Sequence, residues 1–273
     1  MFLFHFKQTT FSGEHAMIWF TIKKTFFDMW DHLLTIALLN IGGTLLIGIV
    51  LYALQLLAVN QWLFFFGVAL AMVIFSIYIA VVAGMTSDIA DYHAPEFRDV
   101  KRYVKSEWRV GCAFSGWMFL QLLVVLIVIP WYFHRNSLLG LGISAFLFWG
   151  SVMWLLASQY YFPVRHRLNP TLLKIPQKCI LLFFDNTAFT VLLGIGTLFL
   201  LVVSGVTVFM FPGISTVLLW HHVALKLRLY KYDYVEAHPG DKRPRIPWDD
   251  LLQEDRDRVG TRTLKEMIFP WKN

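Results

Sequence analysis

Residues 97–133 read FRDVKRYVKSEWRVGCAFSGWMFLQLLVVLIVIPWYF, and they join a basic stretch directly to an apolar run without a single charge. The run from Val110 to Phe133 is long enough to cross the hydrocarbon core of a bilayer, which takes about 20 apolar residues in a helix. The basic stretch before it has the composition of a helix that lies on the membrane surface. These residues therefore predict a transmembrane helix with an amphipathic lead-in.

The same arrangement recurs along the chain. Apolar runs occur in pairs, and the pairs begin near Leu33, Val110 and Thr187, which are 77 residues apart each time. With 57% hydrophobic and only 15% charged residues, the chain lies outside the range of soluble proteins. The predicted spans are Leu33–Val59, Trp62–Met85, Val110–Phe133, Leu138–Val164, Thr187–Phe211 and Ile214–Leu229.

The sixth span is the weakest by composition, since two histidines, Lys226 and Arg228 interrupt it. Charge favours it nevertheless. Twelve basic residues precede span one or lie between the hairpins, whereas Arg135 alone lies in the opposite turns. The positive-inside rule then makes the N-terminus and both long connections cytoplasmic. A cytoplasmic tail requires a sixth crossing, with its basic ends reaching the headgroups.

Each hairpin has an amphipathic lead-in with apolar residues at helical spacing and basic residues on other faces. The three apolar stripes are Trp19, Ile22, Phe26 and Met29; Phe97, Val100, Val104 and Trp108; and Leu172, Ile175, Cys179 and Leu182. We expect these helices to lie on anionic headgroups. The residues predicted at the membrane surface are Lys23, Lys24, Arg98, Lys101, Arg102, Lys105, Lys174 and Lys178.

These patterns predict an all-α integral membrane protein. Its expected fold is a six-helix transmembrane bundle of three hairpins, each preceded by an amphipathic interfacial helix. The expected organisation is a transmembrane domain over 1–230 and a cytoplasmic C-terminal tail over 231–273, in which Asp249 to Arg258 predicts a short polar helix. No cleavable signal peptide is expected, because the apolar run at the start is too short.

The order of these elements resembles the YesL-like family of bacterial membrane proteins, a domain of unknown function. The resemblance rests on residues 97–133, on LLKIPQKCILLFFDNTAFTVLLGIGTLFLLVV (172–203), and on the apolar stretch after Pro212-Gly213. It implies a bacterial inner-membrane protein and a role near carbohydrate uptake. The tail after Lys231 is not a feature that we associate with this family.

Candidate chemistry is sparse. The spans contain polar groups such as Asn40, Gln55, Gln121 and Ser151, which more often bond between helices than bind a substrate. His221 and His222 are adjacent and point about 100° apart on a helix, so helix packing is favoured over metal binding. No phosphate-binding loop, zinc motif or nucleophile elbow is found, so neither an enzyme nor a cofactor is expected.

The chain ends in LKEMIFPWKN, which is unexpectedly apolar for a cytoplasmic terminus. Met267, Ile268, Phe269 and Trp271 are candidate docking residues, either on this chain's own helices or on a membrane-protein partner. The expected partners are the bilayer and such a protein, not a nucleic acid. The leading hypothesis is an accessory or scaffold subunit of a transport or envelope system. The alternative is a transporter for a neutral or lipid-like solute, which would need a cavity lined by the polar groups of the spans.

Overall fold

The chain is described by a computed structural model over residues 2–135, 137–239 and 246–262. These residues form helices and connections, without strands, as predicted from the sequence. Five of the helical stretches are long and apolar enough to cross a membrane. They are Leu33–Leu57, Gln61–Ala90, Val100–Phe133, Leu138–Leu168 and Thr187–Val206. The first five predicted spans are therefore matched by helices of the required length.

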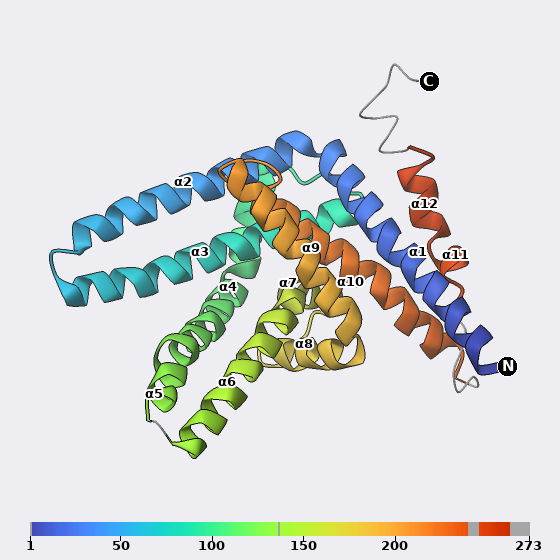
Figure 1. The fold of residues 1–273 in the computed structure, drawn as a ribbon. Coiled ribbons are helices and arrows are strands. Elements are labelled where there is room, and N and C mark those ends of the chain that lie inside the picture. The colour runs from blue at the N-terminus through green and yellow to red at the C-terminus, as the bar shows by residue number, and fades with distance from the viewer. Residues whose placement is uncertain (1, 136, 240–245, 263–273) are drawn as a thin grey trace.

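The helices follow the chain in the order of the predicted units. They are α1 (Phe2–Asp31), α2 (Leu33–Leu57), α3 (Gln61–Ala90), α4 (Val100–Leu123), a π-helical turn η2 (Val124–Val128), α5 (Ile129–Phe133), α6 (Leu138–Ala157), α7 (Tyr161–Leu168), α8 (Lys174–Asp185), α9 (Thr187–Val206), α10 (Gly213–Ala237), α11 (Trp248–Leu251) and α12 (Gln253–Val259). Short 3-10 turns precede α4 and α7. The α2–α3 hairpin and the α4–α6 hairpin project in different directions from a common body (Figure 1).

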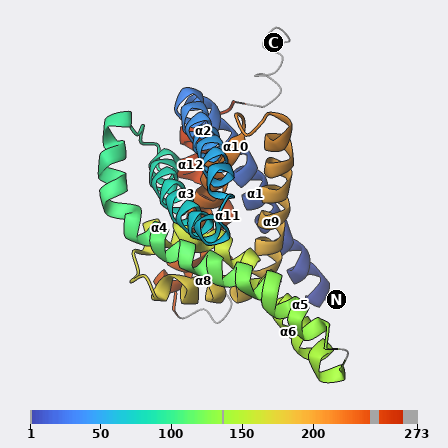
Figure 2. The same cartoon turned by 90° about the vertical axis from the view of Figure 1, so that its left-hand side faces the viewer.

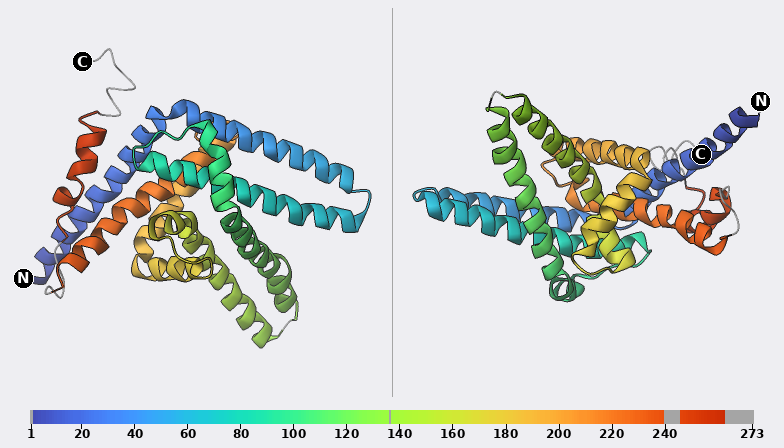
Figure 3. Two further views of the ribbon diagram at one scale, coloured as in Figure 1. Left: turned by 180° about the vertical axis from the view of Figure 1, so that it is seen from behind. Right: turned by 90° about the horizontal axis from the view of Figure 1, so that it is seen from below.

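The body contains α10, which packs against α1, α2, α3, α7 and α9. Figure 2 and Figure 3 show the projecting hairpins from other sides. Their outer parts expose large apolar side chains such as Ile49, Phe66 and Phe146, at 66%, 68% and 78%. Apolar surface of this extent is expected to face lipid. The buried core lies instead where α10, the second half of α3 and α7 meet.

The two projecting hairpins are joined by close packing of α3 against α4. A Cβ atom on Gly111 would lie 2.6 Å from the Cα of Ile77, so only glycine allows this approach of the two backbones. Small residues serve this purpose at helix interfaces in membranes. Gly111 thus fixes where α4 crosses α3.

Asn40 joins α2 to the start of α10. Its Nδ2 donates to the carbonyl oxygen of Pro212 at 2.6 Å, and its Oδ1 accepts from the backbone N–H and hydroxyl of Ser215 at 3.0 and 2.7 Å. Gly213 has a φ of +71°, and a Cβ there would overlap the Asn40 amide. The amide therefore satisfies buried backbone groups that have no partner within α10 at its start.

The turn between α9 and α10 meets α2 near its middle. Besides the Asn40 contacts, the Thr44 hydroxyl donates to the carbonyl oxygen of Val208 at 3.5 Å. Measured along α2, the end at Leu57 lies about 20 Å beyond Thr44 at 1.5 Å per residue. The third hairpin therefore turns back well before the tip of the first.

The predicted lead-ins differ in structure. The second is continuous with its span, since α4 runs from Val100 into the apolar run without a break. The first and third are separate helices, α1 and α8, which end at Asp31 and Asp185. On α8 the predicted stripe is turned inward, with Ile175 and Cys179 fully buried.

Helix α1 departs from the prediction on one face. Trp19 and Ile22 are exposed, as an apolar side facing lipid would be, but Met29 is buried. Lys24, expected at the membrane surface, is fully buried, and so is most of Asp28. The prediction for Lys24 is therefore wrong, because α10 and the segment containing α12 cover that face of α1 (Figure 1).

Candidate functional site: an ionic clamp on the C-terminal segment

The C-terminal segment 246–262, here called the strap, packs on the body of the protein. Trp248, Leu252 and Val259 are buried, with exposures of 5%, 0% and 2%. Trp248 and Val259 lie on the two short helices α11 and α12, and Leu252 lies between them, so the predicted polar helix has one apolar face. Burying three such side chains stabilises attachment by a few kcal/mol, at about 1.5–3 kcal/mol each before the entropic cost of ordering.

A buried carboxylate lies at the centre of this contact. Asp255 of α12 is 3% exposed and accepts hydrogen bonds from the hydroxyls of Tyr92 and Tyr230 at 2.6 and 2.7 Å. The ammonium groups of Lys226 and Lys24 lie 3.2 and 3.9 Å from its Oδ1. Two tyrosine hydroxyls and two ammonium groups, from α1, α10 and the residues directly after α3, therefore converge on one carboxylate of the strap.

A second carboxylate extends this network into α7. Asp91, directly after α3, accepts two hydrogen bonds of 2.8 Å from Nη1 of Arg167. Lys226 lies between the two carboxylates, 3.3 Å from Asp91 and 3.2 Å from Asp255, and it also donates to the carbonyl oxygen of Ala90 at 3.1 Å. We call the whole group the ionic clamp; it comprises Lys24, Asp28, Asp91, Tyr92, Arg167, Lys226, Tyr230 and Asp255.

The environment holds Asp255 in its charged form. Burial alone would raise the pKa of its carboxyl group, but the hydrogen bonds from Tyr92 and Tyr230 and the charges of Lys226 and Lys24 keep it below the usual value. Burial, and then the hydrogen bond to Asp255, raises the pKa of the Tyr92 hydroxyl far above 10. The tyrosines therefore stay neutral donors, and the carboxylate remains an anion at neutral pH.

Lys24 and Asp28 form a buried pair one helical turn apart, with 2.8 Å between Nζ and Oδ2. The ammonium group of Lys24 also lies 3.5 Å from the centre of the Tyr92 ring. Burial lowers the pKa of Lys24 and raises the pKa of Asp28 from 3.8 to about 6, and the mutual attraction opposes both changes. Asp28 thus titrates closer to neutral pH than an ordinary aspartate does.

The end of the strap is held at the C-terminal end of α1. Lys23 donates to the carbonyl oxygen of Gly260 at 3.2 Å. Arg262 binds Asp31 through two hydrogen bonds of 2.8 and 3.0 Å, and its guanidinium lies 4.7 Å from the centre of the Phe27 ring. The chain therefore leaves the strap beside the junction of α1 with the apolar helix α2.

A polar hollow of about 410 Å³ opens beside the clamp. Asp91, Tyr92, His93, Lys226, Tyr230, Glu254, Asp255 and Arg258 line it. Each of its carboxylates is paired with a cation. Glu254 lies 2.8 Å from Arg258, Asp91 binds Arg167, and Asp255 binds Lys226. Within the described residues, His, Cys, Asp and Glu form no group of three that could hold a metal ion. The arrangement is suited to holding helices together by charge.

The other predicted surface residues lie on the outside of the protein. Arg98, Lys101, Arg102, Lys105 and Lys174 are exposed, and Lys23 and Lys178 are partly exposed. Their contact with anionic headgroups stays a prediction. The candidate docking residues Met267, Ile268, Phe269 and Trp271 lie outside the described residues.

Polar residues of the spans contribute to helix packing, as predicted. Gln121 donates to the carbonyl oxygen of Ser151 at 3.2 Å between α4 and α6, and Asn40 bonds to the start of α10. His221 is buried and lies 2.8 Å from the hydroxyl of Thr197 on α9. Gln55 is exposed on the first hairpin. Gln121 and Ser151 thus lie together between α4 and α6, whereas Asn40, Gln55 and His221 lie in other parts of the molecule.

Most of the clamp was not identified from the sequence. Lys24 and Asp28 have the i, i+4 spacing of a helical ion pair, and Lys226 interrupts an apolar stretch. Both features could have indicated buried charge. Asp255 gave no such signal, because it lies in a segment rich in alternating charges that is typical of an exposed helix.

Comparisons with known protein families, with curated proteins and with solved structures found no match to this chain. The arrangement of its own residues therefore carries the functional argument.

Proposed function

We propose that the chain is a non-enzymatic, multi-pass membrane protein that serves as an accessory or scaffold subunit of a transport or envelope system. The observation that carries the proposal is the fixed exit of the C-terminal segment. The strap is held by Asp255, which lies beside Lys24 of α1 and accepts hydrogen bonds from Tyr92 and Tyr230. At its end Arg262 binds Asp31, beside the start of α2. The described chain therefore ends at a defined point next to an apolar helix, which suits the presentation of the apolar, aromatic sequence that follows Arg262 to a partner.

The distribution of polar groups in the spans supports a scaffold over a transporter. A solute path would need several of these groups along one cavity. Gln121 and Ser151 share one pocket, but Asn40 bonds to backbone groups at another helix junction and Gln55 is exposed on the first hairpin. Polar groups that form hydrogen bonds between helices hold the helices together, which favours a rigid bundle.

The proposed topology has both ends on the cytoplasmic side of a bacterial inner membrane. Direct contacts between α1 and the strap, such as Lys23 with Gly260 and Arg262 with Asp31, require both segments to lie on the same side. An even number of passages follows, so α10 returns the chain after α9. The excess of basic residues before and between the hairpins assigns that side to the cytoplasm.

Membership in the YesL-like family and a link to carbohydrate uptake remain proposals that rest on the pattern of residues 97–133 and 172–203. They would make the partner a subunit of an uptake system. The topology and the strap do not depend on them.

The test is capture of the tagged full-length protein from native membranes in mild detergent, followed by mass spectrometry. One variant replaces Met267, Ile268, Phe269 and Trp271 by serine, and a matched control replaces Lys265 and Glu266 by serine. We expect a stoichiometric partner to bind the wild type and the control and to be lost from the first variant at unchanged yield. Recovery of the wild type alone, or the same partner with all three proteins, would contradict the scaffold proposal.

A further inference from the structure

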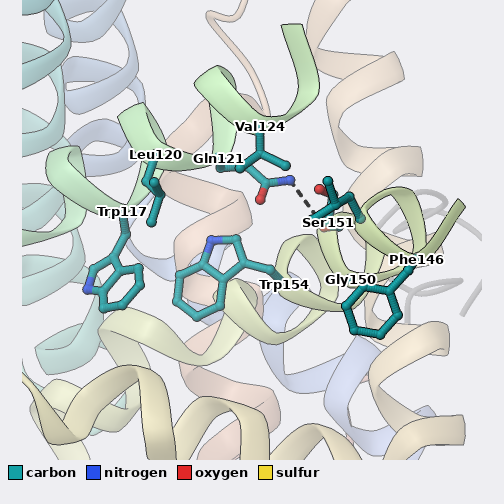
Figure 4. Close-up of a pocket in the computed structure, with 9 residues that line it drawn as sticks. Trp117, Leu120, Gln121, Val124, Phe146, Gly150, Ser151 and Trp154 are labelled. Atoms are coloured by element: carbon teal, nitrogen blue, oxygen red, sulfur yellow. Dashed lines mark hydrogen bonds between the residues drawn. The ribbon is translucent and has the colours of Figure 1, made fainter. Parts of the chain in front are cut away.

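A pocket of about 270 Å³ lies between α4 and α6, in the second hairpin (Figure 4). Its walls are mainly apolar and include Trp117, Leu120, Val124 and Phe146. Figure 4 shows side chains from both helices gathered around it, with the Trp154 ring at its centre. This pocket is separate from the ionic clamp, which is built from α1, the end of α3, α7, α10 and the strap.

The pocket opens onto the apolar outer face of the hairpin. Leu120 and Phe146 are 51% and 78% exposed at its rim, and they continue the apolar surface that extends to the hairpin tip. From the turn at Ser137, Ser151 and Trp154 lie about 20 and 25 Å along α6 at 1.5 Å per residue. With the tip at one boundary of a hydrocarbon core of about 30 Å, Trp154 lies close to the opposite boundary.

One polar group in the pocket wall has no partner. The indole Nε1 of Trp154 is buried and donates to no atom of the described residues. Gln121 lines the same pocket and donates its amide hydrogen to the carbonyl oxygen of Ser151, but its side-chain oxygen accepts no hydrogen bond from the indole. A buried indole N–H normally finds an acceptor, because leaving it unpaired carries the full cost of desolvation.

Two local features make room for a ligand. A Cβ atom on Gly150 would meet no atom within 4 Å, so the space beside Gly150 is empty. A side chain at this position would occupy part of the pocket. On the facing helix, the π-helical turn η2 starts at Val124, another residue of the lining. Such turns displace the backbone from regular helical packing and are frequent at functional sites.

We propose that this pocket binds an acyl chain of a membrane glycerolipid, with the ester carbonyl oxygen accepting the hydrogen bond from Trp154. The apolar walls match the chain, and the lipid-facing opening admits it from the bilayer. The unpaired indole N–H of Trp154, near one boundary of the hydrocarbon core, matches the level at which ester groups of a leaflet begin. The inference is independent of the scaffold proposal, because it uses neither the strap nor a protein partner.

The test compares two phospholipids that differ only in the acceptor. Delipidated protein is mixed with equal amounts of dioleoyl phosphatidylcholine and its dialkenyl ether analogue in detergent, and lipid that remains after size exclusion is measured by mass spectrometry. We expect the wild type to retain one ester lipid in roughly fivefold preference over the ether lipid, the factor of one hydrogen bond. Trp154→Phe should bring this ratio close to one.

Gly150→Leu should fill the pocket and abolish retention of both lipids, whereas Gly142→Leu should behave like the wild type. Gly142 is the matched control, since it lies on the same helix and its Cβ would also meet no atom within 4 Å. Circular dichroism and elution volume establish that each variant is folded. Equal retention of the ester and ether lipids by the wild type, or equal total retention by Gly150→Leu and Gly142→Leu, would overturn the proposal.

Discussion

Helices α1 and α8 carry the same kind of sequence but place their lysines in opposite surroundings. On α8 the apolar residues Ile175 and Cys179 are buried and Lys174 is exposed, as the periodic pattern predicts. On α1 the basic and acidic residues Lys24 and Asp28 are buried. Both helices precede an apolar span, so the difference arises from what packs on them.

The lysines of α1 and α8 differ in burial because other segments cover the polar face of α1. On α1 that face is covered by α10, the strap and the residues directly after α3, which bring Lys226, Asp255 and Tyr92 to Lys24 and Asp28. A buried lysine is tolerated only when anions or hydrogen-bond partners replace its water. An amphipathic pattern therefore identifies two faces, and a distant segment decides whether the charged one is exposed.

The largest expected effect separates these two helices directly. Lys24→Met leaves Asp28 buried with its nearest cation removed, and we expect a loss of about 3–5 kcal/mol in the free energy of unfolding. Lys174→Met on α8 should change it by less than about 0.5 kcal/mol, because that side chain is exposed. Chemical denaturation in detergent micelles, followed by circular dichroism, measures both.

A double variant distinguishes lost pairing from lost packing. Replacing both members of the pair, Lys24→Met with Asp28→Leu, should recover much of the loss, since apolar residues of similar volume often replace buried ion pairs at little cost. Similar losses for the Lys24 and Lys174 single variants would mean that the two helices do not differ in burial as described.

A smaller effect is expected from pH. The folded state raises the pKa of Asp28 to about 6, so it binds a proton there before the unfolded state does, whose value is near 3.8. Stability from this group therefore rises as the pH falls through 6, and wild type should gain about 1 kcal/mol relative to Asp28→Asn between pH 7 and pH 5. Denaturation of both proteins at the two pH values measures the difference.

Other groups that titrate in this range, including the histidines, contribute equally to the stability of wild type and Asp28→Asn. Their contributions therefore cancel in the difference between the two proteins. Asp255 contributes with the opposite sign, because its pKa is lowered in the folded state. Its contribution is lost only as the pH falls below about 4, outside the range tested. Parallel stability curves for wild type and Asp28→Asn would show that Asp28 is not buried against Lys24.

Features that depend on a short stretch of sequence could be predicted correctly. Charge-free apolar runs such as Val110–Phe133 became helices of the expected length, and Asn40 proved to be a helix-packing residue. The clamp could not be predicted in the same way, since it joins Lys24 to Asp255 across most of the chain. The pocket at Trp154 depends on how α4 and α6 approach each other, which hydropathy does not specify.

The charged strap packs on the body through one buried face, and Asp255 holds it against α1 and α10. Hydrogen–deuterium exchange of the full chain in lipid nanodiscs tests it most directly. We expect the amides of Gln253–Val259 to be protected to a degree comparable with those of α10, and Asp255→Ala, but not Asp257→Ala on the exposed side, to remove this protection. Rapid exchange of Gln253–Val259 in the wild-type protein would contradict the account.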